Sequence, residues 1–145
     1  MAVAVTLRLA PRLLAEIRHE AERAYPGECC GAIAGHVAPV KRGVRLYPLA
    51  NLRTDDPHRY LIDAEQLRRV ERDATVEGWE VLGFYHSHPD HPAVPSEFDV
   101  AHAWPWYSYL ILRVASGRAE NAASWVLHAE EPRMEPEVLE IESEV

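Results

Sequence analysis

The chain of 145 residues has few cysteines, and the two that it has are adjacent. Neighbouring cysteines such as Cys29 and Cys30 rarely bridge each other, because the short loop between them resists disulfide geometry. They also lack the CxxC spacing of a zinc ribbon or a redox motif, and no Cys/His/Asn grouping marks either as a nucleophile. We therefore expect two reduced, buried thiols with a packing role, in a reducing compartment.

The chain also lacks an excess of positive charge. Lysine and arginine total 15 against 23 aspartates and glutamates, and the formal net charge of −8 argues against a nucleic-acid partner. The acidity is concentrated at the end, where residues 130–145 hold seven glutamates and one arginine. We expect residues 129–145 to form a solvated acidic tail after a single domain at residues 1–128.

Long apolar runs are absent as well. None approaches the ~20 residues that a membrane-spanning helix requires, so no membrane association is expected. The start of the sequence has no basic leader followed by an apolar stretch and a cleavage site, and no secretory signal is visible. The sequence therefore favours a cytoplasmic location.

The hydrophobic pattern predicts one mixed α/β domain. Apolar residues at helical spacing predict helices from Pro11 to Tyr25, from Asp63 to Glu77 and from Ser96 onward. Strands are predicted at residues 3–9, 28–40, 41–50, 79–88, 107–114 and 119–128, with a polar connection at residues 51–58. Consecutive strands and the lack of a long linker favour a single-domain mixed, largely antiparallel β-sheet flanked by helices.

The residues that suggest chemistry follow the strand at residues 79–88. His86 and His88 are two apart, so both side chains point to one face of the strand and could bind one metal ion. Asp99 lies three residues after Ser96, which places these two on one face of a helix. Two histidines and a carboxylate with an open fourth position are typical of a catalytic zinc site.

Simpler interpretations of these residues stay open at this point. Two histidines at a strand end are often only solvated, and Ser96 with Asp99 matches a capping box for the first turn of a helix. Glu28, beside a helix end, has the position of an ordinary surface residue. His91 is a spare ligand, a substrate contact or an exposed loop residue.

Other candidate residues carry no clear pattern. Trp104, Trp106 and Tyr107 are expected to pack in the core, with substrate contact as the alternative. The remaining histidines lack a partner at ligand spacing and are interpreted as ordinary: His19, His36, His58, His102 and His128.

Two motifs together resemble those of a known family. His-x-His, seven residues, Ser, two residues and Asp is similar to the signature of JAMM-type metallopeptidases, the catalytic members of the MPN-domain superfamily. The family places a glutamate upstream, in a Pro-x-Glu-x-Cys-Gly-x-x-x-Gly segment that residues 26–35 match with Glu28. Residues 59–65 are similar to the family segment that leads into its middle helix. The resemblance covers residues 7–125.

The resemblance implies an MPN, cytidine-deaminase-like fold and a role for each matched residue. His86, His88 and Asp99 would hold one Zn²⁺ per chain, with water in the fourth position. Glu28 would act as general base and pass the proton to the leaving amine. Ser96 would donate a hydrogen bond to the oxyanion, a role worth ~3 kcal/mol in comparable sites. This set of groups suits peptide or isopeptide hydrolysis.

Chain length narrows the class of substrate that the resemblance implies. Relatives that cleave ubiquitin chains generally carry insertions and extra domains, for which 145 residues leave little room. The chain looks like the compact, stand-alone prokaryotic members, some of which act at the C-terminal glycine of a ubiquitin-like sulfur-carrier protein or its conjugates. Such a tail could add as a strand at a sheet edge, and apolar edge strands also leave a homodimer open.

Three alternatives belong to other functional classes. A non-catalytic MPN scaffold that binds a protein partner would usually lack one or more of the five matched residues, and all five are present. A nucleobase deaminase would need a PCxxC motif, which the sequence lacks. A non-enzymatic metal site would need a fourth protein ligand, for which His91 is the nearby candidate.

Overall fold

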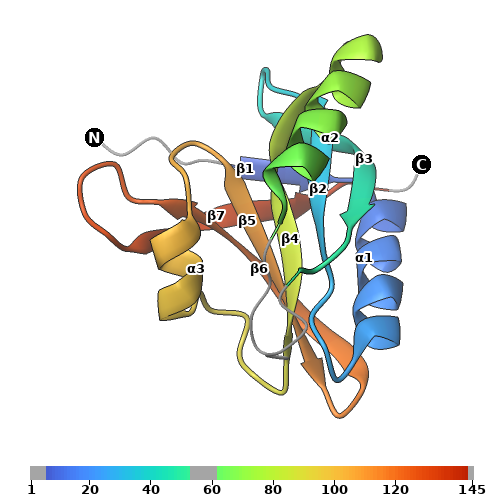
Figure 1. The fold of residues 1–145 in the computed structure, drawn as a ribbon, viewed down its shortest axis with the longest axis vertical. Helices are drawn as coiled ribbons and strands as arrows, with labels where there is room; N and C mark the ends of the chain where they lie inside the picture. The colour runs from blue at the N-terminus through green and yellow to red at the C-terminus, as the bar shows by residue number, and fades with distance from the viewer. Residues whose placement is uncertain (1–5, 53–61, 144–145) are drawn as a thin grey trace.

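A computed structural model describes residues 6–52 and 62–143, which form three helices and seven strands (Figure 1). In chain order the elements are β1 (Thr6–Leu9), α1 (Pro11–Ala24), β2 (Cys30–His36), β3 (Lys41–Leu49), α2 (Ala64–Val76), β4 (Glu80–Pro89), α3 (Glu97–His102), β5 (Ser108–Ala115), β6 (Arg118–Leu127) and β7 (Met134–Ile141). The three predicted helices and six predicted strands are confirmed within the described residues, and β7 is additional.

Some predictions lie outside the described residues. They concern the start of the first strand at residues 3–5, His58, most of the polar connection at residues 51–58, and residues 59–61 of the family-like segment. Within the described ranges, no helix combines the length and apolar character needed to cross a membrane.

The strands form one closed barrel in the order β1-β3-β2-β4-β5-β6-β7. Antiparallel pairs join β2 to β3 and β4, and join β6 to β5 and β7. Parallel pairs join β4 to β5, and join β1 to β3 and β7. The mixed α/β architecture is confirmed, whereas the closure of the sheet into a barrel is a feature that the strand pattern did not predict.

Strand β7 lies inside the segment predicted to be a solvated tail, so that prediction is wrong for residues 134–141. The strand pairs with β6 through its first half and with β1 through its second half. Its buried residue is Glu137, which accepts a hydrogen bond from Ser124 Oγ at 2.6 Å and lies 3.8 Å from Lys41 Nζ. Because these partners compensate the buried charge, a glutamate-rich segment can close the barrel.

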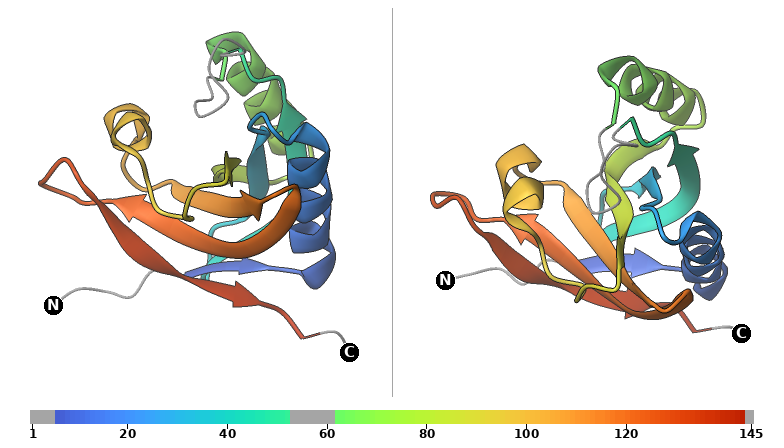
Figure 2. Two further views of the ribbon diagram at one scale, coloured as in Figure 1. Left: turned by 90° about the horizontal axis from the view of Figure 1, so that it is seen from below. Right: turned by 60° about the horizontal axis from the view of Figure 1, so that its bottom comes forward.

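Strand β4 separates two hydrophobic clusters and ends at the candidate site. Tyr85 packs in a cluster with the apolar face of α1, whereas Phe84 packs in a second cluster with Val70 of α2. Since side chains alternate along a strand, His86 and His88 continue the Phe84 face. The end of β4 lies between α3 on one side and α1 and α2 on the other (Figure 2).

Candidate metal centre and active site

His86 and His88 project from the last part of β4, which is paired with β5 as far as Pro89 and with β2 as far as His86. Strand β2 flanks β4 through the pair Cys30–His86, and β5 flanks it through Ile111–His86 and Arg113–His88. Both residues are buried, since only 1% of the surface of His86 and 6% of the surface of His88 is exposed. Their Nε2 atoms lie 3.1 Å apart. Pairing of β4 with β5, and with β2 up to His86, therefore holds the two ring nitrogens beside each other.

Helix α3 brings Asp99 to the same point. Ser96 Oγ accepts a hydrogen bond from Asp99 N at 3.0 Å, and Ser96 N donates to Asp99 Oδ2 at 2.8 Å, which forms a complete capping box. The Asp99 carboxylate also reaches the histidines, with Oδ1 3.3 Å from His86 Nε2 and Oδ2 3.1 Å from His88 Nε2. The Asp99 carboxylate thus caps the helix and contacts both histidines. Its interpretation as part of a capping box is therefore compatible with its interpretation as a metal ligand.

Glu28 joins this group from the segment just before β2. The antiparallel register pairs Cys30 with His86, and Ser87 N donates to the carbonyl of Cys29, so the chain just before β2 still follows β4 and brings Glu28 beside the histidines. One carboxylate oxygen of Glu28 and one ring nitrogen of each histidine all lie within 4.8 Å of one another. Glu28 is only 5% exposed, and its interpretation as a surface residue is therefore wrong.

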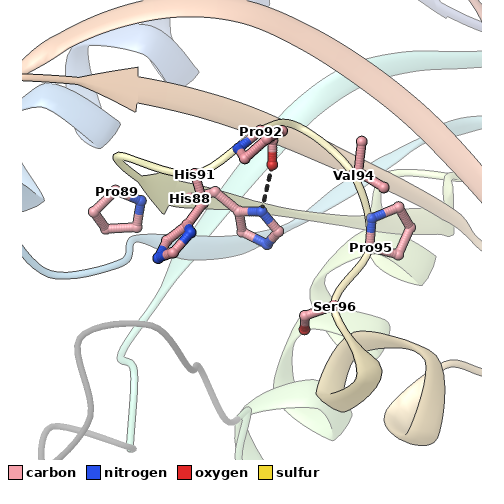
Figure 3. Close-up of a pocket in the computed structure, with 7 residues that line it drawn as sticks. All are labelled: His88, Pro89, His91, Pro92, Val94, Pro95 and Ser96. Carbon is pink, nitrogen blue, oxygen red and sulfur yellow. Dashed lines mark hydrogen bonds between the residues drawn. The ribbon is translucent and has the colours of Figure 1, made fainter.

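The loop after β4 sets the orientation of the His88 ring. His88 Nδ1 lies 2.8 Å from the carbonyl oxygen of Pro92 (Figure 3). A carbonyl oxygen only accepts, so Nδ1 must carry the hydrogen and donate it. A neutral His88 then presents the lone pair of Nε2 toward His86 and Asp99, which is the arrangement of a metal-ligating histidine with a carbonyl partner.

The charges of the group also favour a cation between the side chains. Burial lowers the pKa of His86 and outweighs the Asp99 carboxylate, which raises it. Burial raises the pKa of Asp99, but the two histidines and the Ser96 amide lower it by more than burial raises it. The net result is a pKa well below the usual range of a carboxyl group. At neutral pH a neutral imidazole therefore faces a buried anionic carboxylate, and a bound cation would stabilise both.

The donor set fits zinc in its distances. Ligand atoms about 2.0–2.1 Å from a tetrahedral zinc ion lie roughly 3.3 Å from one another. The nitrogen and carboxylate atoms of His86, His88 and Asp99 are separated by 3.1–3.3 Å. One carboxylate oxygen of Glu28 also lies within 4.8 Å of a ring nitrogen of each histidine, so Glu28 adjoins these donors, and the Asp99 contacts are the ones that match zinc-ligand spacing.

A cavity of about 470 Å³ opens beside His88 and Ser96 (Figure 3). The Pro-rich loop after β4 forms its wall, and this loop is held at Ala93, whose carbonyl accepts a hydrogen bond from Trp125 Nε1 at 3.0 Å. His91 is exposed on this loop and lines the cavity, which makes it a neighbour of the site. A molecule in the cavity would contact both the histidine and the serine of the motif.

A second cavity, of about 310 Å³, adjoins Asp99 on the side of α2, and the sequence pattern did not predict it. It is mainly apolar and is lined by Ile62, Ala64, Leu67, Phe84, Phe98, Asp99, Ala101, His102, Trp104 and Tyr109. The prediction that Trp104 and Trp106 pack in the core is wrong, because they are 51% and 47% exposed. Tyr107 does pack against the Phe84 cluster, with ring centroids 5.4 Å apart.

The prediction of two buried free thiols is confirmed for Cys29 and Cys30. Burial raises the pKa of each thiol to about 12, so both are protonated and unreactive near neutral pH. We expect iodoacetamide at mildly alkaline pH to modify neither cysteine of the folded protein and both after denaturation. Mass spectrometry of the intact chain counts the added groups, and rapid labelling of the native protein would contradict the burial.

Comparison with known proteins agrees with the motif. Residues 10–128 match the family described as prokaryotic homologs of the JAB domain. The chain is 33% identical to a desampylase of Haloferax volcanii over 100 residues, which are 68% of this chain and 71% of that protein. It is 34% identical to a probable TtuB-protein conjugate cleaving protease of Thermus thermophilus over 107 residues, 74% of this chain and 70% of that protein.

Solved structures extend the similarity to almost the whole chain. A protein from Desulfitobacterium hafniense superposes with a TM-score of 0.83 and 28% identity, covering 96% of this chain and 94% of its own. A JAB1/MPN domain protein from Archaeoglobus fulgidus shares the fold with a TM-score of 0.60 and 17% identity, covering 98% of this chain and all of its own. The chain therefore belongs to the JAB family of JAMM/MPN proteins, in its prokaryotic branch.

Proposed function

We propose that the protein is a zinc-dependent peptidase or isopeptidase that hydrolyses an amide bond at the C-terminal glycine of a ubiquitin-like protein, of the sulfur-carrier type, or of its conjugates. The observation that carries the proposal is the convergence of His86, His88 and Asp99 at 3.1–3.3 Å with the Glu28 carboxylate beside them. The names of the two relatives, a desampylase and a protease of TtuB-protein conjugates, support the choice of substrate.

In this proposal His86, His88 and Asp99 hold the zinc ion. Zinc at such a site supplies Lewis acidity, which makes water more acidic and stabilises negative charge on a carbonyl oxygen. Glu28 accepts the proton of the attacking water and donates it to the departing amine. Its burial keeps this proton away from bulk water, and its position within 4.8 Å of both histidine nitrogens keeps the carboxylate near the water and the departing amine.

Ser96 stabilises the charge that develops on the substrate carbonyl. Its oxygen already accepts the amide of Asp99, which leaves the hydroxyl hydrogen to donate. Ser96 lines the larger cavity together with His88, so a carbonyl that enters this cavity lies within reach of the hydroxyl. The capping box holds Ser96 in one position and thereby prepares the donor before substrate binds.

The two cavities suit an extended C-terminal tail. A glycine next to the scissile bond has no side chain and can approach the buried Asp99 and His88 closely. The apolar cavity next to Asp99 can then take an apolar side chain of the same tail. The described strands close into a barrel, which goes against the expectation that the tail adds as a strand at a sheet edge. In this proposal the tail lies in the two cavities beside the site.

The proposed activity is tested with the ubiquitin-like carriers of the host organism. Each carrier is prepared with a C-terminal extension and with an isopeptide-linked partner, and is incubated with the zinc-loaded protein. We expect mass spectrometry to detect release of the extension or of the partner directly after the terminal glycine. Zinc binding without cleavage of any carrier would contradict the enzyme and favour the non-catalytic MPN scaffold.

Replacement of Ser96 by alanine is expected to lower kcat by about 10²–10³-fold, because an oxyanion donor is lost. The free energy of unfolding should fall by only about 1 kcal/mol, since the helix loses its cap. Ser96→Thr keeps both the hydroxyl and the cap and serves as the matched control. Steady-state kinetics with thermal unfolding separates the effects, and equal activity of the alanine and threonine variants would remove Ser96 from the mechanism.

A further inference from the structure

The loop that follows β4 is anchored by Asp90, a residue to which the proposed mechanism gives no role. Its Oδ2 accepts a hydrogen bond from the Tyr25 hydroxyl at 2.5 Å, and its Oδ1 accepts one from the Ser116 amide at 2.8 Å. Its own amide donates to the carbonyl of Val114 at 2.7 Å. Asp90 thus contacts the end of α1 and the β5–β6 turn at the same time.

The backbone of Asp90 has a conformation that depends on these contacts. Its φ is 56°, in the left-handed region that few residues other than glycine, asparagine and aspartate adopt. The Tyr25 ring lies against the same turn, because a Cβ at Gly117 would be 3.8 Å from Tyr25 Cδ1. The turn, the tyrosine and the aspartate therefore form one contact group.

This group connects the two segments that carry the candidate site. Tyr25 ends α1 three residues before Glu28, and Asp90 follows His88 by two residues. Asp90 also begins the loop whose Pro92 carbonyl orients the His88 ring. The Tyr25–Asp90 hydrogen bond joins the segments just beyond the point where the pairing between β2 and β4 stops.

We propose that Tyr25 and Asp90 act as a clamp that sets the position of the Glu28 carboxylate relative to His88. Both are positioning residues for proton transfer, and this inference rests on the proposed function. A hydrogen bond to a charged carboxylate is stronger than one between neutral groups, which suits it to hold two segments in register. A displacement of about 1 Å in a catalytic group is enough to cost ~100-fold in rate.

The clamp is tested with two variants whose new residue suits the backbone conformation at its own position. Tyr25→Phe keeps the ring and removes the hydroxyl, whereas Asp90→Gly keeps the left-handed conformation and removes both side-chain hydrogen bonds. We expect kcat to fall about tenfold in Tyr25→Phe and at least as far in Asp90→Gly, with KM and zinc content unchanged. The double variant should be no slower than Asp90→Gly, because both changes break the same bond.

Two control variants lie away from the clamp. Tyr47→Phe removes a phenol hydroxyl on β3, and Glu140→Gln weakens an exposed ion pair with Arg8 at 2.8 Å, and both should keep wild-type kcat. Additive losses in the double variant, or a tenfold loss in Tyr47→Phe, would overturn the clamp.

A second measurement does not depend on activity. Hydrogen–deuterium exchange of the metal-free protein, followed at the amides of residues 27–30, should be faster in Tyr25→Phe and Asp90→Gly than in the wild type and both controls. Unchanged exchange in the two clamp variants would overturn the inference. If the wild-type protein binds zinc but cleaves no carrier, the proposed function fails, and the exchange experiment still decides whether the clamp holds the Glu28 segment.

Discussion

Replacement of Glu28 by alanine is expected to lower kcat by about 10²–10⁴-fold while one zinc ion per chain is retained. The reason is that His86, His88 and Asp99 already meet at 3.1–3.3 Å, so loss of the neighbouring Glu28 carboxylate removes a proton acceptor and leaves the three proposed zinc ligands in place. Turnover of a carrier conjugate and metal analysis by mass spectrometry measure the two quantities on the same sample.

Two further variants sharpen this test. Glu28→Gln keeps the size and hydrogen-bonding capacity of the side chain and removes its ability to accept a proton, so it should be nearly as slow as Glu28→Ala. Glu16→Gln makes the same chemical change at an exposed position of α1 and should keep wild-type activity. Full activity of either Glu28 variant would show that the general base is a different group.

Replacement of His86 or Asp99 by alanine is expected to reduce bound zinc from about one ion per chain to near zero, with complete loss of turnover. Each variant removes one of three side chains that meet within 3.1–3.3 Å, and two ligands hold zinc much more weakly than three. Metal content after dialysis measures the loss, and cobalt substitution offers an absorption spectrum that reports the ligand set without activity.

The two ligand variants differ in their expected effect on folding. Asp99→Ala also breaks the capping box of α3, so its free energy of unfolding should fall by about 1 kcal/mol in addition to the loss of metal stabilisation. His19→Ala removes an exposed imidazole from α1 and is the matched control for histidine loss. Wild-type zinc content in His86→Ala would place the metal elsewhere and overturn the proposed centre.

The spacing of residues along the sequence predicted most of the helices and strands and most of the residues of the candidate site. The spacing of His86 and His88 is a property of one strand, and the spacing of Ser96 and Asp99 is a property of one helix turn, so both could be read directly. The family motif added Glu28, which its local sequence had marked as a surface residue. The structure brings all five residues to one region, while their catalytic and metal-binding roles stay predictions.

Sequence pattern gave wrong predictions where a residue contacts side chains that are distant in the sequence. Residues 129–145 are rich in glutamate, which favoured a solvated tail, yet Glu137 is buried because Ser124 and Lys41 compensate its charge. Trp104 was expected in the core and instead lines the cavity next to Asp99. Lys41 is far from Glu137 in the sequence, and Ile62, Leu67 and Phe84, which line the same cavity as Trp104, are far from Trp104, so neither a local pattern nor composition predicts these contacts.

The sequence by itself determined the order of the three helices and the first six strands, the two adjacent thiols and the grouping of His86 with His88 and of Ser96 with Asp99, because these depend on spacing along one element. Only the tertiary structure decided that the barrel closes through β7, that Glu28 is buried beside the two histidines, and that Asp90 joins Tyr25 to the loop after β4. The physical reason is that strand register and long-range hydrogen bonds arise only when separate segments pack together.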